Sequence, residues 1–318
     1  MDQQSHFVVS LDFELMWGVR DHLSVAQYGE NVRGVRQAIP ALLDLFARYG
    51  IRATWATVGF LFCETRDDLM ASLPALRPGY LQGALSNYAY LDEIGYDETG
   101  DPHYFGFSLL KTIQSCPGQE IATHTFSHYY CLEEGQTPDQ FTVDIEAAIA
   151  VARRRGIELK SIVFPRNQYA PEHLAIAHNA GLRTFRGNEK SWIYRPTNGK
   201  QQSKLRRACR LVDQYVDVSG NHVQHPRQIA GLTEIASSRF LRPFSPSLGS
   251  FDKLRLSRIK SAINAAALQQ GIFHLWWHPH NFGRNLTENI GFLKAILDHF
   301  AQARESHGMR SSRMDDFA

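Results

Sequence analysis

The sequence predicts an α/β fold and, more specifically, a (β/α) barrel. Short apolar runs rich in β-branched and aromatic residues alternate with segments whose apolar residues recur at helical spacing. Several of these runs end directly in a cluster of polar side chains, and polar groups gathered where parallel strands end are typical of α/β active sites. The chain of 318 residues can accommodate one barrel of roughly 250 residues with insertions. We therefore expect a single catalytic domain over residues 1–318.

The first half of the chain begins with a buried strand at 7–11. Apolar residues at helical spacing between 32 and 49 predict a helix, which Gly50 would end. Residues 51–58 predict the second strand. An insertion at about 63–104 is rich in glycine, proline and tyrosine, so we expect a long structured loop over the site. A short helix around 109–113 and a third strand at 120–123 follow.

In the second half, Thr137 and Pro138 are typical of a helix start and predict a helix that runs to Gly156. The regular pattern weakens at about 198–250, where a basic helical patch surrounds Arg206; we interpret that patch as a solvated face. We expect residues 309–318 to form a loose tail. The other predicted elements are strands at 161–165, 182–185 and 272–277 and helices at 171–180, 256–270 and 286–304.

Composition and charge exclude several classes of protein. The formal net charge is +2, which is too balanced to drive non-specific binding to nucleic acid. No stretch approaches the ~20 apolar residues of a transmembrane helix. The four cysteines lie far apart, which indicates reduced thiols, and residues 1–6 carry no export signal. We expect a cytoplasmic protein, with peripheral association with the inner membrane as an open alternative.

A metal site is predicted from two histidines and a carboxylate. His124 and His128 have the i,i+4 spacing that places two imidazoles on one face of a helical turn, within reach of one ion. Glu14 can add the oxygen ligand of a two-histidine, one-carboxylate set that leaves a position open for water. Asp12 and Glu14 alternate along an extended chain and would share one face. One carboxylate would then bind the ion while the other takes a proton from its water.

These residues resemble the polysaccharide deacetylase family, carbohydrate esterase family 4, with its NodB-type homology domain. The run from His124 to His128 matches the family's second motif, His-[Ser/Thr]-x-x-His, and Asp12-Phe13-Glu14 is similar to its first, Asp-x-Asp. The resemblance extends from about residue 6 to residue 283. It implies a distorted seven-stranded (β/α)7 TIM-like barrel with the site at the carboxyl ends of the strands. It also implies Asp12 as the base, Glu14, His124 and His128 as metal ligands, and a divalent metal, with Zn²⁺ expected.

The later motifs of the family are found in altered form. Arg166 and Tyr169 lie in a variant of Arg-x-Pro-Tyr, and we expect Arg166 to pair with Asp12 because guanidinium offers a planar fork to a carboxylate. Asp-x-x-Asp-Trp is not recognisable, so no partner is assigned to orient the acid histidine. His278 falls in a longer form of Leu-x-His and is our candidate for the general acid, with His280 as the alternative.

The sequence allows two interpretations for each of three further residues. Trp277 is either a core residue or a stacking face for a sugar. Arg239 either holds an anionic group of the substrate or is an ordinary ion-pair partner. Cys131 could be a fourth ligand, but a thiolate would close the open coordination position, so we interpret it as a buried free thiol.

Together these features predict a hydrolase of linear amides. The expected activity is metal-dependent N-deacetylation of an amino sugar or glycan in surface-glycan, O-antigen or lipopolysaccharide biosynthesis. Alternatives are a deformylase or allantoinase-like hydrolase of a non-sugar amide, and a non-catalytic carbohydrate-binding protein of the same fold. The sequence predicts neither the sugar and the acyl group nor the oligomeric state.

Overall fold

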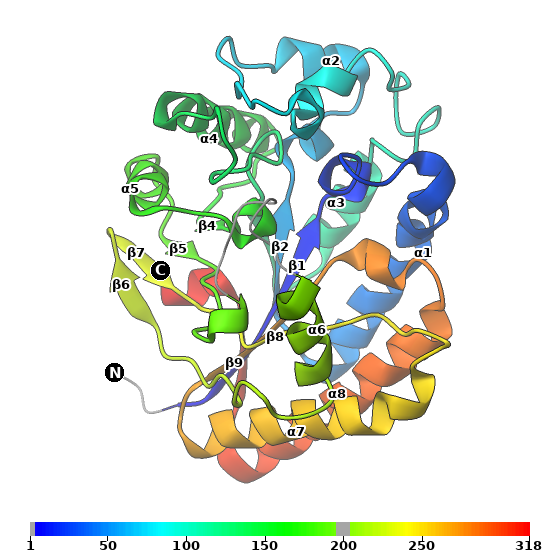
Figure 1. Ribbon diagram of the computed structural model, residues 1–318, viewed down its shortest axis with the longest axis vertical. Helices are drawn as coiled ribbons and strands as arrows, with labels where there is room; N and C mark the ends of the chain where they lie inside the picture. Colours follow the sequence, from blue (N-terminus) through cyan, green and yellow to red (C-terminus); the bar gives the residue numbers. More distant parts are fainter. Residues whose placement is uncertain (1–3, 195–203) are drawn as a thin grey trace.

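A computed structural model describes residues 4–194 and 204–318 (Figure 1). Residues 198–203 of the segment predicted to be irregular lie outside these ranges. In the described part of the chain, no helix is long and apolar enough to span a membrane.

The centre of the molecule is a curled, largely parallel sheet in the order β6-β7-β5-β4-β3-β2-β1-β9-β8 (Figure 1). Buried apolar side chains on β1 explain its central position. The strands are β1 (His6–Phe13), β2 (Ala53–Thr57), β3 (Gln119–Thr123), β4 (Ser161–Ile162), β5 (Thr184–Phe185), β6 (Arg227–Ile229), β7 (Leu232–Glu234), β8 (Arg239–Phe240), β9 (Ile272–Trp277) and β10 (Arg310–Ser312).

The two ends of this sheet belong to one continuous segment. The backbone of Ser237 donates to Gly187, beyond the end of β5, and the next residue, Ser238, donates to His274 on β9. The chain from β7 to β8 therefore bridges both edges and occupies one position between β5 and β9. This arrangement is a distorted (β/α) barrel, so the predicted fold class is confirmed.

Helices cover the outside of the sheet (Figure 1). They are α1 (Val25–Tyr49), α2 (Arg66–Ala71), α3 (Phe107–Ser115), α4 (Pro138–Arg154), α5 (Pro171–Asn179), α6 (Lys204–Asp213), α7 (Asp252–Leu268) and α8 (Leu286–His307). Helix α4 begins where Thr137 and Pro138 predicted, with Thr137 accepting from the backbone of Gln140. Helix α1 begins seven residues before the predicted start, because the capping pair Ser24 and Gln27 precedes the apolar pattern.

The C-terminal segment is not a loose tail, and that prediction is wrong. Strand β10 pairs in parallel with the first half of β1, and a short 3-10 helix, η10 (Met314–Phe317), follows it. Met314 is fully buried among Val8, Ala56 and Val163, so the segment contributes to the barrel interior. Its apolar anchors are Met309, Met314 and the partly buried Phe317, and their spacing produces no periodic signal in the sequence.

Beneath the site, a buried glutamate holds this C-terminal segment in place. Glu120 on β3 accepts from Thr54 Oγ1 at 2.6 Å, from the backbone of Asp315 at 3.2 Å and from Ser161 Oγ. Burial, together with the nearby Asp315 charge, raises the pKa of Glu120 to about 7. The folded protein therefore retains a proton on this carboxyl that the unfolded chain loses.

We expect the free energy of unfolding to decrease as pH rises from mildly acidic to neutral, because the folded protein holds this proton. Because the pKa of Glu120 is raised in the folded state, the contribution of this carboxyl to stability is fully present below pH about 4.5. It is lost as the pH rises through about 7. The slope is at most about 1.4 kcal/mol per pH unit. Thermal unfolding from pH 5 to pH 8 should be flatter for Glu120→Gln than for wild type, whereas Asp315→Asn should move the wild-type decline to lower pH. Parallel curves for wild type and Glu120→Gln would contradict the assignment.

Candidate active site

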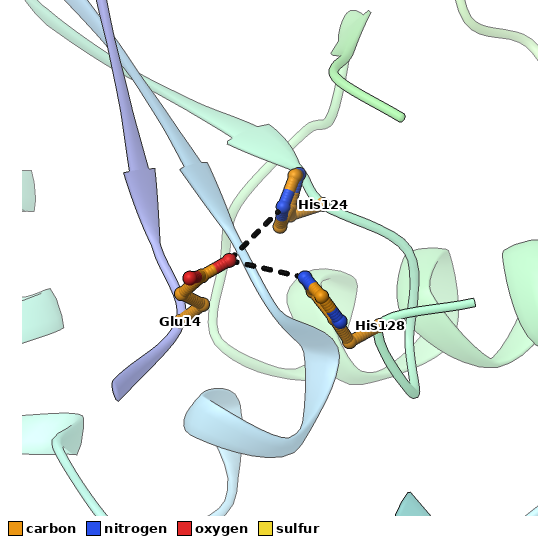
Figure 2. A group of neighbouring side chains, drawn as sticks. All are labelled: Glu14, His124 and His128. Atoms are coloured by element: carbon orange, nitrogen blue, oxygen red, sulfur yellow. Dashed lines mark hydrogen bonds and ion pairs between the residues drawn. The ribbon is translucent and has the colours of Figure 1, made fainter. Parts of the chain in front are cut away.

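Three buried side chains converge at the carboxyl ends of β1 and β3 (Figure 2). Glu14 directly follows β1, while His124 and His128 lie in the loop after β3. Glu14 Oε2 lies 3.3 Å from His124 Nε2 and 3.0 Å from His128 Nε2. One atom from each residue lies within 4.8 Å of the others, as the ligands of a single ion would.

The histidine loop is irregular and bent rather than helical, so the predicted helical turn is wrong. Thr125 and His128 have φ angles of 64° and 59°, in the left-handed region. Thr125 Oγ1 accepts from the backbone of Tyr129 at 2.7 Å. Asp144 on α4 accepts from the backbone amides of Phe126 and Ser127. These contacts turn both imidazoles toward Glu14 without the helix that the spacing indicated.

The orientation of the histidines fits a metal ion. His124 Nδ1 lies 2.8 Å from the carbonyl of Val163, which fixes the tautomer with Nδ1–H and leaves Nε2 free to coordinate. Burial alone would raise the pKa of Glu14, but His278, His124 and His128 lower it well below its usual range. Two imidazole nitrogens and one carboxylate oxygen are a donor set suited to Zn²⁺.

Gly18 provides the space that the Glu14 carboxylate occupies. It ends the short 3-10 helix η1 (Leu15–Gly18), and a Cβ at this position would lie 1.9–2.3 Å from the carboxylate atoms of Glu14. We expect Gly18→Ala to displace the carboxylate and lower metal affinity by about 10–100-fold, as loss of other groups that orient ligands does. Gly291→Ala is a matched control because its Cβ would meet nothing within 4 Å. Calorimetric metal titration of both variants measures the effect, and equal affinities would show that Glu14 does not need this space.

Asp12 is held by Arg186, not by Arg166. Arg186 Nη1 and Nη2 lie 2.7 and 2.8 Å from the two carboxylate oxygens of Asp12, and Arg186 also donates to Ser10 Oγ at 3.1 Å and to Asn167 Oδ1 at 3.0 Å. Burial would raise the pKa of Asp12, but Arg186 together with His124 and His278 lowers it, so the group is an ionised carboxylate.

The predicted pairing of Arg166 with Asp12 is therefore wrong. Arg166 has a φ of 53° and points to the rim of the site, where it pairs with Asp21 and lies 3.6 Å from Glu133. Its guanidinium also lies over the ring of Tyr130, which packs edge-on against His128. Arg186 directly follows the predicted strand 182–185, so the rule that polar groups follow strands could have found it.

His278 lies beside both carboxylates. Its Nε2 is 3.7 Å from Asp12 Oδ2 and 3.6 Å from Glu14 Oε1, and its side chain is 23% exposed. His280 stacks on it with ring centroids 4.9 Å apart, but is only 3% exposed. Burial, and then the charge of His278, lowers the pKa of His280 to about 3. Asn281 Oδ1 lies 3.4 Å from His278 Nδ1 and is the group that the structure places to orient this ring.

The remaining candidates lie outside this cluster or contribute to the core. Trp277 is fully buried and stacks on Phe282, so the structure favours the core interpretation, whereas Trp276 lies beside His278 with the guanidinium of Arg186 over its ring. Arg239 is buried against Asp213. Tyr169 packs against Phe164 and Phe185, and Cys131 is a buried free thiol.

The insertion predicted at 63–104 contacts the loops that carry Glu14, His124 and His128. Asn87, which is 4% exposed, donates to the carbonyl of Trp17 at 2.9 Å and to that of Ser127 at 3.0 Å. It thereby connects the segment after Glu14 to the histidine loop. Tyr80 Oη accepts from the backbone of Tyr130 at 2.7 Å. The insertion is thus a structured wall of the site.

Comparisons with known proteins identify the fold. No protein-family model and no curated protein matches the chain. A structure described as a polysaccharide deacetylase from Mycobacterium smegmatis is similar with a TM-score of 0.62 at 13% identity, over 99% of this chain and 90% of that one. The chain therefore has the barrel fold of polysaccharide deacetylases, as the sequence resemblance predicted.

The same barrel also occurs in enzymes of other chemistry. A GH57 branching enzyme from Thermococcus kodakaraensis matches with a TM-score of 0.53 at 14% identity, over 98% of this chain and 70% of that one. A 4-alpha-glucanotransferase from Thermococcus litoralis matches with a TM-score of 0.54 at 12% identity, over 99% of this chain and 40% of that one. The fold alone therefore does not identify the reaction, and the side chains of the site must do so.

Proposed function

We propose that the chain is a metal-dependent hydrolase that removes the N-acetyl group from an amino sugar. The observation that carries the proposal is the convergence of Glu14, His124 and His128 with an ionised carboxylate, Asp12, and a partly buried imidazole, His278, beside them. A divalent ion, which we propose to be Zn²⁺, would polarise the amide carbonyl and acidify the attacking water.

Side chains of the protein would then accept and donate the protons of the reaction. Asp12, held in one orientation by the paired contacts of Arg186, would accept the proton of the attacking water. His278, which lies beside the two carboxylates and is partly accessible to solvent, would donate a proton to the departing amine. Asn281 and the stacked ring of His280 would hold the imidazole of His278 in place.

Glycoside transfer, the chemistry named for two structural neighbours, fits this site less well. That reaction uses a carboxylic acid with a raised pKa beside a second carboxylate. Here Asp12 is engaged by Arg186 on both oxygens, and Glu14 faces two imidazoles. Each carboxylate therefore has partners that favour the charged form, which suits a base and a metal ligand.

The substrate and its pathway are a separate proposal from the reaction. We propose an amino-sugar intermediate of surface-glycan, O-antigen or lipopolysaccharide assembly as the substrate, handled in the cytoplasm or at the inner membrane. Mass spectrometry of N-acetylated and N-formylated sugar nucleotides and lipid-linked glycans, before and after incubation with the zinc-loaded protein, tests this. Loss of acetyl from a sugar supports the proposal, loss of formyl indicates a deformylase, and no mass change together with no bound metal indicates a carbohydrate-binding protein.

We expect His278→Ala to lower turnover by about 10²–10⁴-fold while leaving metal content intact, since a positioned acid contributes about this much. The alkaline limb of the rate profile should flatten, because the loss of the acid's proton sets that limb. His280→Ala should have a smaller effect because its ring is buried behind His278. The reverse pattern would assign the acid role to His280, and loss of metal from His278→Ala would make this residue a ligand.

A further inference from the structure

Helix α6 presents its apolar residues to solvent. Leu205, Ala208 and Val212 recur at i, i+3 and i+7 and therefore form one stripe. Leu205 is 68% exposed and Val212 is 49% exposed, whereas the neighbouring Asp213 is fully buried. A surface helix ordinarily buries its apolar stripe, so the orientation of α6 is inverted.

Buried polar contacts fix this orientation. Asp213 accepts from Tyr194 Oη at 2.8 Å and from the backbone of Ser219 at 2.8 Å. The guanidinium groups of Arg239 and Arg258 lie 3.6 and 3.7 Å from its carboxylate. Rotating the stripe inward would break all these contacts and leave buried charges without partners. The apolar stripe is therefore a stable surface feature of the described chain.

The stripe is part of a larger apolar surface. Exposed apolar side chains continue along the chain after α6, and Tyr215 contacts Phe251 at the start of α7 with ring centroids 6.1 Å apart. Before α6, the exposed Trp192 accepts a hydrogen bond on its carbonyl from Arg206 at 2.9 Å. We call the following residues the α6 surface: Trp192, Leu205, Ala208, Val212, Val216, Val218, Phe251 and Leu254.

Basic residues outnumber acidic ones around the α6 surface. Helix α6 carries Arg206, Arg207 and Arg210, whereas its Asp213 is buried. The acidic residues within the surface, Asp217 and Asp252, pair with the buried Arg258 and Arg255. An apolar stripe between basic residues, with an exposed tryptophan at its border, has the composition of helices that lie in the interface of anionic membranes. A symmetric contact with a second copy would bring these like charges together. We propose that the α6 surface docks on an anionic lipid bilayer.

This docking would also define the substrate class, an inference that rests on the proposed function. Arg239, the partner of Asp213 on α6, lies on β8 beside β9, the strand that ends before His278. The α6 surface is therefore connected through these two strands to the site. A sugar attached to a membrane lipid could reach the site while its lipid remained in the bilayer.

Vesicle sedimentation of the full chain tests the docking. We expect binding to phosphatidylcholine vesicles that contain phosphatidylglycerol, weaker binding to pure phosphatidylcholine, and weakening by salt. Leu205→Ser combined with Val212→Ser should lower the affinity by about 10²-fold, because both side chains lose their apolar insertion. Leu268→Ser is the matched control, since Leu268 is 70% exposed but lies roughly 20 Å along α7 from Leu254.

Several outcomes would overturn the docking proposal. They are no vesicle binding, equal binding to both lipid compositions, and wild-type binding by the α6 double variant. Self-association that the double variant abolishes, without vesicle binding, would assign the surface to a second copy instead. Deacetylation of a water-soluble analogue is measured separately. If the chain bound vesicles but did not deacetylate the analogue, only the proposed function would be overturned.

Discussion

Alanine at Glu14, His124 or His128 is expected to remove the bound metal and with it the activity. Each residue would supply one of three protein ligands, and their coordinating atoms lie within 4.8 Å of one another. The loss of Lewis-acid stabilisation amounts to several kcal/mol, which corresponds to a fall in turnover of about 10³-fold or more. Metal analysis after dialysis, together with turnover on the identified substrate, measures both effects.

Two matched substitutions distinguish this result from unfolding. His222→Ala removes a half-buried histidine that contacts Ser219 and Tyr194, away from the metal cluster, and should keep the metal. Glu14→Asp should give a partial loss, because the shorter side chain withdraws its oxygen from a bond that tolerates only about 0.2 Å. If His124→Ala and His128→Ala each retained a full equivalent at wild-type affinity, the metal site would be wrongly assigned.

The sequence predicted the barrel and the cluster of Glu14, His124 and His128 because each depends on a local pattern. Strands such as 7–11 and 272–277 are short apolar runs. Glu14 and His124 directly follow β1 and β3, and His128 lies four residues after His124. Their convergence follows from the parallel order of β1, β2 and β3, which brings the strand ends to one edge.

Features that depend on long-range pairing could not be predicted in this way. The choice of Arg186 over Arg166 is decided by β5, which aims Arg186 into the barrel, and by the left-handed backbone of Arg166, which directs its side chain toward Asp21. The loop between His124 and His128 owes its shape to Asp144, which lies on the next helix. The C-terminal segment is ordered because Met314 fills space inside the barrel, and no pattern in residues 309–318 indicates that space.

Arg186 therefore carries a prediction that distinguishes the structure from the sequence-based pairing. Asp12→Asn is expected to keep the metal and to lower turnover by about 10²–10⁴-fold, the usual contribution of a positioned base. Arg186→Met should lower turnover as well, because Asp12 would lose both contacts that fix its orientation. It should also lower stability by about 3–5 kcal/mol, since a buried carboxylate would remain without its partner.

The double variant Asp12→Asn with Arg186→Met separates a specific pair from general damage. Both buried charges are then removed together, so stability should recover relative to Arg186→Met alone, and turnover should fall little below that of Asp12→Asn. Arg166→Met is the matched control, because its partners are Asp21 and Glu133, and it should show no such coupling to Asp12→Asn. Additive losses of stability and turnover in the Arg186 double variant would contradict the pairing of Asp12 with Arg186. Strong coupling between Arg166→Met and Asp12→Asn would assign Asp12 to Arg166 instead. Denaturant unfolding and steady-state turnover are measured for the three single variants and for the two double variants that contain Asp12→Asn. Only the Arg186 pair should couple, because Asp12 and Arg186 contact each other directly whereas the partners of Arg166 lie at the rim.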